Sequence, residues 1–328
     1  MAKIYFASNR LAAFRRSALN ITESTTLGSP ARYDSAVVGS AITAPRGRIL
    51  TAFFNEGAVT EVYVQVSFNR PADGSGDLVR LVNSSGVPVF RVTLVSGGTT
   101  YRADFWNGSA WVTTGSTFIL PNASLTVLDI RLTCGASGSY EVWINGFVAA
   151  SVLGTLNAAV NNVDRVECIS GLLSLGDMYF SQVWASDEPT LGRRLTSNVA
   201  NANGANNDGT GSFSDTNSMP WNPDTFRRLP ANGNKFTMTH AGRTFPGGYR
   251  IVAVGVNGAQ RANGGVVANS RPVLRLSSTD YPGANVAPAP FATFDNRSAP
   301  FWFDNPNTAA AWANSEFNSL EFGWEARS

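Results

Sequence analysis

The sequence is poor in the residues on which most catalytic and nucleic-acid-binding sites depend. Its 328 residues include two cysteines and one histidine, and charged residues make up only 15% of the chain. The formal net charge of +2 is spread along the length, whereas nucleic acid requires a dense basic face. No window approaches the roughly 18 apolar residues of a membrane-spanning helix, and the first residues lack the apolar centre of a signal peptide. We therefore expect a soluble chain made in the cytoplasm, with no nucleic-acid partner and no membrane insertion.

Motifs for catalysis, metals and cofactors are also missing. His240, the single histidine, would have to serve any zinc site or Ser-His-Asp triad alone. The chain has no Glu-x-Asp-x-(x)-Glu pattern for glycoside hydrolysis and no phosphate loop. Residues 73–77 imitate the start of a calcium loop, but Ser84 stands where a glutamate is required. We predict no catalytic residues, no metal, no cofactor and no enzyme activity, and the pairing of Cys134 with Cys168 stays open.

The composition and periodicity that remain are those of β-structure. The chain carries 31 Gly and 16 Pro, while lysine and glutamate are scarce, which favours strands and turns over helices. Val62, Val64 and Val66 alternate with polar or aromatic residues, which predicts a half-buried strand. Such strands recur about every 8 to 12 residues without helical periodicity. This pattern predicts an all-β protein with a sandwich of jelly-roll type.

A segment poor in apolar residues divides the chain. Residues 197–220 are rich in Asn and Gly, so we expect a linker or loop that packs no core of its own. The other predicted parts are an N-terminal arm with the first strands (1–50), a jelly-roll domain (51–196) and a C-terminal β-sandwich domain (221–328). Within the last part, Asn314 or Ser315 is expected to cap one short helix that ends near Leu320.

Tryptophan residues are the candidate ligand-binding groups, because the C–H faces of sugars stack on aromatic rings. Trp143 alternates with the expected core residues Val142 and Ile144, so its side chain should point outward. Trp184 belongs to the same group of interest, although aromatic residues in sandwiches more often lie in the core or at a subunit interface. The predicted carbohydrate-binding residues are Trp106, Asn107, Trp111, Trp143 and Asn145.

Three short motifs resemble known protein families. The sequence YEVWINGFV (140–148) resembles the strand, Asn-Gly turn and strand of concanavalin A-like and laminin-G-like lectin domains. Residues 179–195 are similar to the closing strand of such domains in tailed-phage virion proteins. The C-terminal pattern resembles the ending of small appendage proteins of phages and gene-transfer agents, with the matching residues Asp304, Pro306, Thr308, Trp312, Asn318, Leu320 and Gly323.

The resemblance implies a concanavalin A-like jelly-roll sandwich followed by a smaller C-terminal β-domain with one short helix. It also implies a fibre or spike in the virion of a tailed bacteriophage or gene-transfer agent. The expected partners are host-surface polysaccharide, other virion structural proteins and further copies of the chain in a trimer. The chain departs from calcium-dependent lectins, because it shows no convincing paired set of carboxylate and carbonyl ligands.

Two alternatives stay open at this point. The first is a purely structural head-decoration, neck or collar component, in which the aromatic residues are buried against neighbouring subunits. The second is a capsule depolymerase whose carboxylates converge from separate strands without a linear motif.

Overall fold

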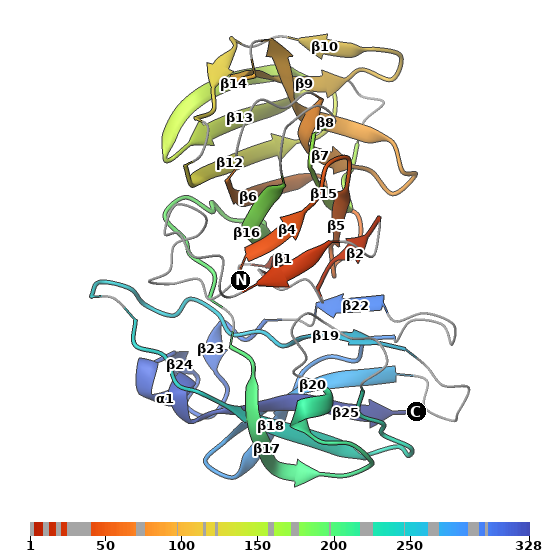
Figure 1. Ribbon diagram of the computed structural model, residues 1–328, viewed down its shortest axis with the longest axis vertical. Helices are drawn as coiled ribbons and strands as arrows, with labels where there is room; N and C mark the ends of the chain where they lie inside the picture. The colour runs from red at the N-terminus through yellow and green to blue at the C-terminus, as the bar shows by residue number, and fades with distance from the viewer. Residues whose placement is uncertain are drawn as a thin grey trace. The chain divides into compact units, whose positions relative to one another are not determined.

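The computed structural model describes residues 3–8, 13–17, 21–24, 41–69, 76–96, 98–113, 116–121, 124–156, 161–171, 177–196, 198–216, 226–245, 247–261, 269–287, 295–298 and 301–328. The chain divides into two compact units, unit 1 (residues 1–196) and unit 2 (residues 197–328), and both are built almost entirely of strands (Figure 1). Within the described residues, none of the helices has the length and hydropathy that crossing a membrane would require.

Unit 1 contains two antiparallel sheets. Sheet A follows the order β14 (Phe147–Leu156), β13 (Gly138–Ile144), β12 (Thr126–Thr133), β6 (Glu61–Asn69), β16 (Met178–Ser186), β4 (Ala41–Ala44) and β3 (Thr22–Ser24), and β1 (Ile4–Ser8) also pairs with β16. Sheet B follows the order β10 (Trp111–Thr113), β9 (Thr100–Trp106), β8 (Pro88–Ser96), β7 (Asp77–Val82), β15 (Arg165–Ile169), β5 (Ile49–Phe53) and β2 (Arg15–Arg16), and β11 (Phe118–Ile119) pairs with β9.

The connections between the sheets are those of a jelly roll. Strands β4, β5, β6 and β7 alternate between sheets A and B, so each crosses the core to reach the next. Strand β16 then inserts between β4 and β6, and β15 inserts between β5 and β7, which nests the late strands among the early ones. The predicted all-β jelly-roll sandwich is confirmed.

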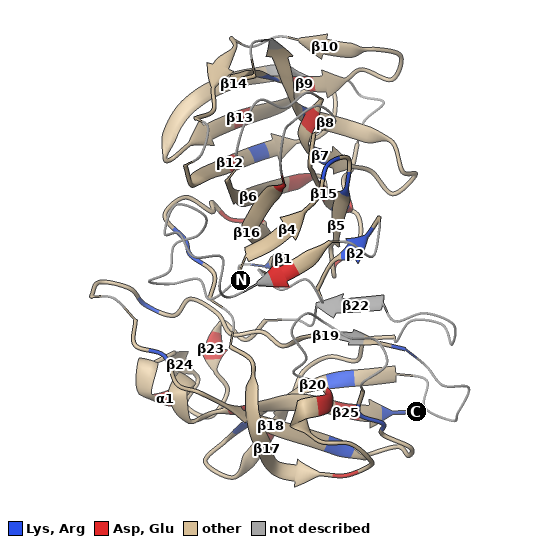
Figure 2. Ribbon diagram, in the orientation of Figure 1, with Lys and Arg blue, Asp and Glu red and all other residues tan. Residues whose placement is uncertain are grey.

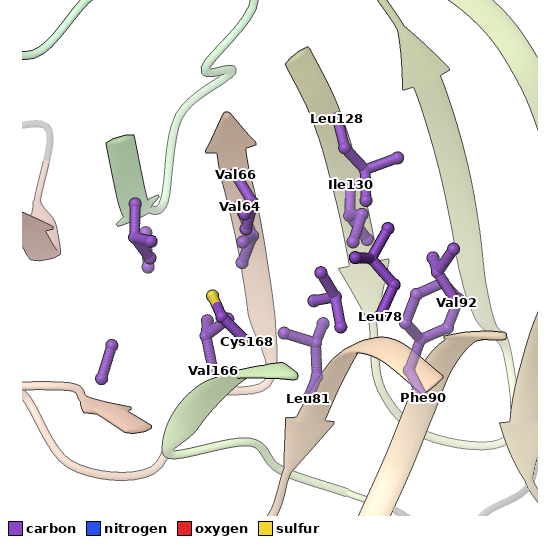
Figure 3. Close-up of a cluster of buried hydrophobic side chains, with 14 of the residues drawn as sticks. Val64, Val66, Leu78, Leu81, Phe90, Val92, Leu128, Ile130, Val166 and Cys168 are labelled. Carbon is purple, nitrogen blue, oxygen red and sulfur yellow. The ribbon is translucent and has the colours of Figure 1, made fainter. Parts of the chain in front are cut away.

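Alternation along each strand builds the core of unit 1. Figure 3 shows side chains of β6 and β12 from sheet A meeting those of β7, β8 and β15 from sheet B. Val64, Val66 and Ile130 are fully buried on this inner face, and their chain neighbours point to the opposite face. The inner faces therefore hold the two sheets together, and the outer faces are left to carry other groups.

The described N-terminal residues are strands of the sandwich, so this region supplies the expected first strands and its described part is not a separate arm. Strand β1 pairs with β16, and all five of its residues are buried. Tyr5 stacks on Phe54 with ring centroids 5.6 Å apart, and Phe6 meets Phe14 edge-on at 5.1 Å. These apolar contacts order the segment within its own unit.

Unit 2 is built on a five-stranded antiparallel sheet. Its order is β17 (Ala200–Asn207), β18 (Lys235–His240), β25 (Glu321–Arg327), β20 (Asn269–Leu276) and β21 (Thr279–Pro282). Two-stranded ribbons are formed by β19 (Asn257–Gln260) with β22 (Asp295–Ser298) and by β23 (Asp304–Asn305) with β24 (Ala310–Ala311). The described part of unit 2 thus shows one larger sheet with two ribbons, which differs from the expected sandwich.

The predicted short helix is confirmed as α1 (Asn314–Ser319), although its cap differs from the expectation. Ala313 is the N-cap residue, and its backbone N–H donates to Glu316 Oε2 at 2.8 Å. A 3₁₀ turn (η2, Phe213–Asp215) also lies in unit 2.

The Asn/Gly-rich segment is not only a linker, because residues 200–207 form edge strand β17. Because β17 has few apolar side chains, hydrogen bonds to polar side chains of neighbouring strands hold it in the sheet. The backbone N–H of Ala205 donates to Glu321 Oε2 at 2.8 Å, and that of Asn206 donates to Thr237 Oγ1 at 3.1 Å. A Cβ at Gly204 would lie 2.3 Å from Glu321 Oε2, so this strand requires a glycine there.

Residues of the C-terminal motif hold unit 2 together. Trp312 is buried and donates from Nε1 to the carbonyl oxygen of Trp302 at 3.0 Å. The Asn318 amide accepts from the backbone N–H of Arg243 at 2.7 Å and donates to its carbonyl oxygen at 3.0 Å. At Gly323 a Cβ would lie 1.8 Å from the carbonyl oxygen of Phe236. These residue types are therefore required by packing inside unit 2.

Candidate functional site

A row of four side chains crosses the outer face of sheet A. Trp143 on β13 is in register with Asp129 on β12, Asp129 with Gln65 on β6, and Gln65 with Trp184 on β16. Each of the four alternates along its strand with core residues, so all four project away from the core. We call this set the Trp143–Trp184 row. It places an aromatic ring at each end and a carboxylate and an amide between them.

A charged cluster lies one register step away on the same face. Arg131 pairs across the strands with Tyr63 and Glu141. Its Nε and Nη2 atoms donate to Glu61 Oε1 at 3.1 and 3.0 Å, and Nη1 lies 3.6 Å from Glu141 Oε2. The guanidinium carbon lies 5.6 Å from the centroid of the Tyr63 ring. The Arg131, Glu61 and Glu141 side chains keep 34%, 41% and 27% of their surface exposed, so the cluster is open to a ligand.

The ionisation of this face follows from burial. Burial raises the pKa of Tyr63, although the Arg131 guanidinium acts in the opposite direction. Tyr63 therefore keeps its proton at neutral pH and can donate a hydrogen bond. Figure 2 shows acidic and basic residues interspersed along the strands of unit 1, so no large field of one sign arises there.

The middle of the Trp143–Trp184 row is covered. Asp129 and Gln65 are 2% and 0% exposed. Asp129 Oδ1 accepts from Thr190 Oγ1 at 2.7 Å and from Gln65 Nε2 at 3.1 Å. Burial raises the pKa of Asp129, although these two hydrogen bonds act in the opposite direction. Segment 187–196, which follows β16, therefore closes part of the face.

The outer face of sheet B carries the second aromatic group. Trp106 and Trp111 are cross-strand partners on β9 and β10, with ring centroids 5.5 Å apart in an edge-to-face arrangement. The Arg91 guanidinium lies over the Trp111 ring, 4.1 Å from its centroid. One face of Trp111 is therefore already occupied by a side chain of its own sheet.

Asp104 fixes the position of that guanidinium. Its Oδ2 accepts from Arg91 Nε and Nη2 at 3.0 and 2.9 Å, and its Oδ1 accepts from Thr113 Oγ1 at 2.7 Å. Arg102 Nε lies 2.9 Å from the same Oδ1, and the Asp104 side chain is fully buried. The sheet B group is thus an ion-pair network centred on Asp104 that joins β8, β9 and β10.

The predicted site residues fall into two groups on opposite outer faces. Trp106 and Trp111 belong to sheet B, with Asn107 in the turn between β9 and β10, whereas Trp143 belongs to sheet A, with Asn145 in the turn between β13 and β14. The two asparagines serve their turns. Asn107 Oδ1 accepts from the backbone N–H groups of Ser109 and Ala110, and Asn145, at a φ of 51°, accepts from the N–H of Val127.

Sequence reasoning missed the polar partners of Trp143. Tyr63, Gln65 and Arg131 stand at outward positions of strands predicted from the alternation, which was the available signal. Nothing in the sequence shows that β6 and β12 are neighbours, so the cluster itself was not predictable.

The remaining titratable candidates are structural. His240 Nε2 lies 3.1 Å from the carbonyl oxygen of Phe317, and its ring packs against Phe317 and Phe322. Both cysteines are free. Burial raises the pKa of Cys134 to about 12 and raises the pKa of Cys168 as well. No group of three or more His, Cys, Asp or Glu residues suited to a metal occurs in the part of the chain that the structure describes. Residues 73–75 of the calcium-like run lie outside it.

No protein-family model matches the sequence, and no curated protein matches it. Among solved structures, the globular domain of T. cruzi calreticulin is similar with a TM-score of 0.42 and 10% identity, over 56% of this chain and 88% of that chain. The endo-β-1,4-glucuronan lyase of Trichoderma reesei gives 0.42 and 7%, over 56% and 96%. The carbohydrate recognition domain of Emp47p gives 0.36 and 10%, over 56% and 96%.

These comparisons correct one prediction. The sequence analysis predicted no enzyme activity, but polysaccharide lyases, including the alginate lyase Aly36B, are among the structures similar to this chain. The exclusion of enzyme activity is wrong. It rested on the absence of linear motifs, whereas a site on the face of a sheet is assembled from side chains of several strands.

Proposed function

We propose that unit 1 binds polysaccharide through the outer face of sheet A. The observation that carries the proposal is the juxtaposition of the half-buried Trp143 ring with the exposed cluster of Tyr63, Arg131, Glu61 and Glu141. Sugar rings present C–H faces to aromatic rings and hydroxyl groups to charged hydrogen-bonding side chains. The outer face of sheet A offers both types of group to an extended chain.

Sheet B supports this function less well. Trp111 is covered on one side by Arg91, and Asp104 already accepts hydrogen bonds from Arg91 and Thr113. The cluster on sheet A keeps more of its charged surface exposed.

We further propose that the chain is a component of a virion appendage, a fibre or spike, and that it assembles as a trimer with other virion structural proteins. The support is the resemblance of the C-terminal motif, whose residues Trp312, Asn318 and Gly323 maintain unit 2. Repetition of a weak site on one particle would multiply its effective affinity. Mass spectrometry of purified particles from a strain carrying this sequence tests the location, and light scattering of the purified chain tests the trimer.

The binding test compares Trp143→Ala with Trp111→Ala on an array of bacterial surface polysaccharides. Loss of an aromatic stacking contact should weaken binding by about tenfold in Trp143→Ala. Trp111→Ala is the matched control, because it removes a ring from the opposite face. Equal binding by wild type and Trp143→Ala, or loss in Trp111→Ala alone, would move the site away from sheet A.

Cleavage of the bound polysaccharide is a second candidate function. Glu61 and Glu141 both pair with Arg131 and favour it, because a pair of carboxylates beside a bound sugar chain is the group that acid–base cleavage requires. Release of reducing ends that stops in Glu141→Gln would support cleavage. Bound polysaccharide that stays intact through a long incubation would rule it out.

A further inference from the structure

The Trp143–Trp184 row continues beneath segment 187–196. Adjacent strands lie about 4.8 Å apart, so the row spans about 14 Å from β13 to β16. The Trp143 end is partly exposed, whereas Gln65 and Trp184 are 0% and 5% exposed. One end of a single polar and aromatic row is therefore open, and the other end is closed.

Hydrogen bonds fasten the covering segment to the sheet. Near its start, Ser186 Oγ on β16 donates to the carbonyl oxygen of Glu188 at 2.7 Å. Thr190 donates from Oγ1 to Asp129 at 2.7 Å and accepts through its carbonyl oxygen from Gln65 Nε2 at 3.0 Å. Further along, the backbone N–H of Leu195 donates to Gln182 Oε1 at 2.9 Å. These contacts are all polar, so water or a polar ligand could replace them when the segment moves.

Beneath the segment, several buried polar atoms have no hydrogen-bond partner within the described part of the chain. On the sheet they are Gln65 Oε1, Ser67 Oγ and Trp184 Nε1, and the segment itself carries one more, Arg193 Nη1. Gln65 and Trp184 face each other across β6 and β16, Ser67 is the next outward residue on β6, and the Arg193 guanidinium lies 5.6 Å from the Trp184 ring. Burying a hydrogen-bonding atom without a partner costs folding free energy, so we expect a polar molecule to bind to these atoms.

The unsatisfied atoms have the chemistry of a hydroxyl-binding site. Trp184 supplies an N–H donor, Gln65 supplies an acceptor, and the Ser67 hydroxyl can do either. Arg193 belongs to the segment and would move with it. A saccharide hydroxyl both donates and accepts, and the Trp184 ring adds an apolar surface beside these groups. Water is the other molecule with this complement of hydrogen bonds.

We propose that the covered half of the row is a second saccharide subsite, and that segment 187–196 swings away to admit a longer oligosaccharide along β13, β12, β6 and β16. This inference rests on the proposed polysaccharide binding at Trp143. Only molecules with the segment open can bind a long oligosaccharide at both subsites, so the closed state lowers the apparent affinity for long oligosaccharides. Weakening the contacts of the segment should therefore tighten their binding.

The test compares Thr190→Val with Thr190→Ser. Valine has nearly the shape of threonine but cannot donate to Asp129, whereas serine keeps the hydroxyl. The probes are size-graded oligosaccharides cut from the polysaccharide that the wild type binds, measured by titration calorimetry. Thr190→Val should bind long fragments about tenfold more tightly than wild type and short fragments equally well, and Thr190→Ser should behave as wild type.

A second measurement uses the wild type alone. Long fragments should speed hydrogen exchange in segment 187–196, and short fragments should leave it unchanged. Equal affinity of all three proteins for long fragments, with unchanged exchange, would overturn the subsite and leave water as the occupant. Failure of the wild type to bind any polysaccharide on the array, before fragments are prepared, would overturn the proposed function together with the subsite.

Discussion

Replacing Asp104 by asparagine should destabilise unit 1 by about 3 kcal/mol, because it removes the charge from a fully buried carboxylate without changing its size. Asp104 accepts two hydrogen bonds from Arg91 and one from Thr113, and Arg102 lies within ion-pair distance. Asparagine offers a single acceptor oxygen and turns an NH₂ group toward these donors.

The magnitude follows from the exposure of the partners. Removing one member of a fully buried pair costs about 3–5 kcal/mol. Arg91 and Arg102 keep 19% and 34% of their side-chain surface exposed, so water compensates part of the loss. The lower end of that range corresponds to a fall in melting temperature of about 6–12 °C for a unit of this size.

Calorimetry of the full chain measures the effect, with Glu56→Gln as the matched control. Glu56 pairs with Lys3 at 3.4 Å, and both side chains are well exposed, so its loss should cost less than about 1 kcal/mol. A melting temperature of Asp104→Asn within about 2 °C of that control would refute the reasoning. The β9–β10 hairpin would then not depend on this ion-pair network.

Three further predictions concern packing, pH and thiols. Gly323→Ala should destabilise unit 2 by about 3 kcal/mol, since a Cβ there would meet the Phe236 carbonyl oxygen, and an unchanged urea midpoint would contradict this. Burial alone would raise the pKa of Asp280, but its hydrogen bonds lower it. The stability from this carboxylate is therefore complete above its unfolded pKa of about 3.9 and is lost as pH falls through the lower folded pKa. Urea midpoints of Asp280→Asn and wild type should differ at neutral pH and converge as the pH falls through the folded pKa, and a difference that does not shrink on acidification would count against the prediction. Cys134 and Cys168 should react with a thiol reagent only after denaturation, because burial raises the pKa of both thiols; prompt labelling of the folded chain would show otherwise.

The alternation of residues predicted much of unit 1 correctly. Val62, Val64 and Val66 point into the core, and Trp143 lies on the outer face between Val142 and Ile144, because a strand turns successive side chains to opposite sides. The same rule identifies single strands but does not predict which strands pair with each other. It also misses a strand that lacks apolar residues, as the expected linker shows. Strand β17 has few apolar residues, and distant polar groups on β18 and β25 hold it in the sheet.

The sequence by itself determined the β-class through its composition, the strand faces in unit 1 through period-two alternation, and the short helix through the polar residues at 314–315. Each of these signals acts over a few neighbouring residues. Only the tertiary structure decided the partners of each strand. It set Trp143, Asp129, Gln65 and Trp184 in one row and laid segment 187–196 over half of it. These contacts join strands that are far apart in the chain, so their geometry depends on how the whole sandwich closes rather than on any local pattern.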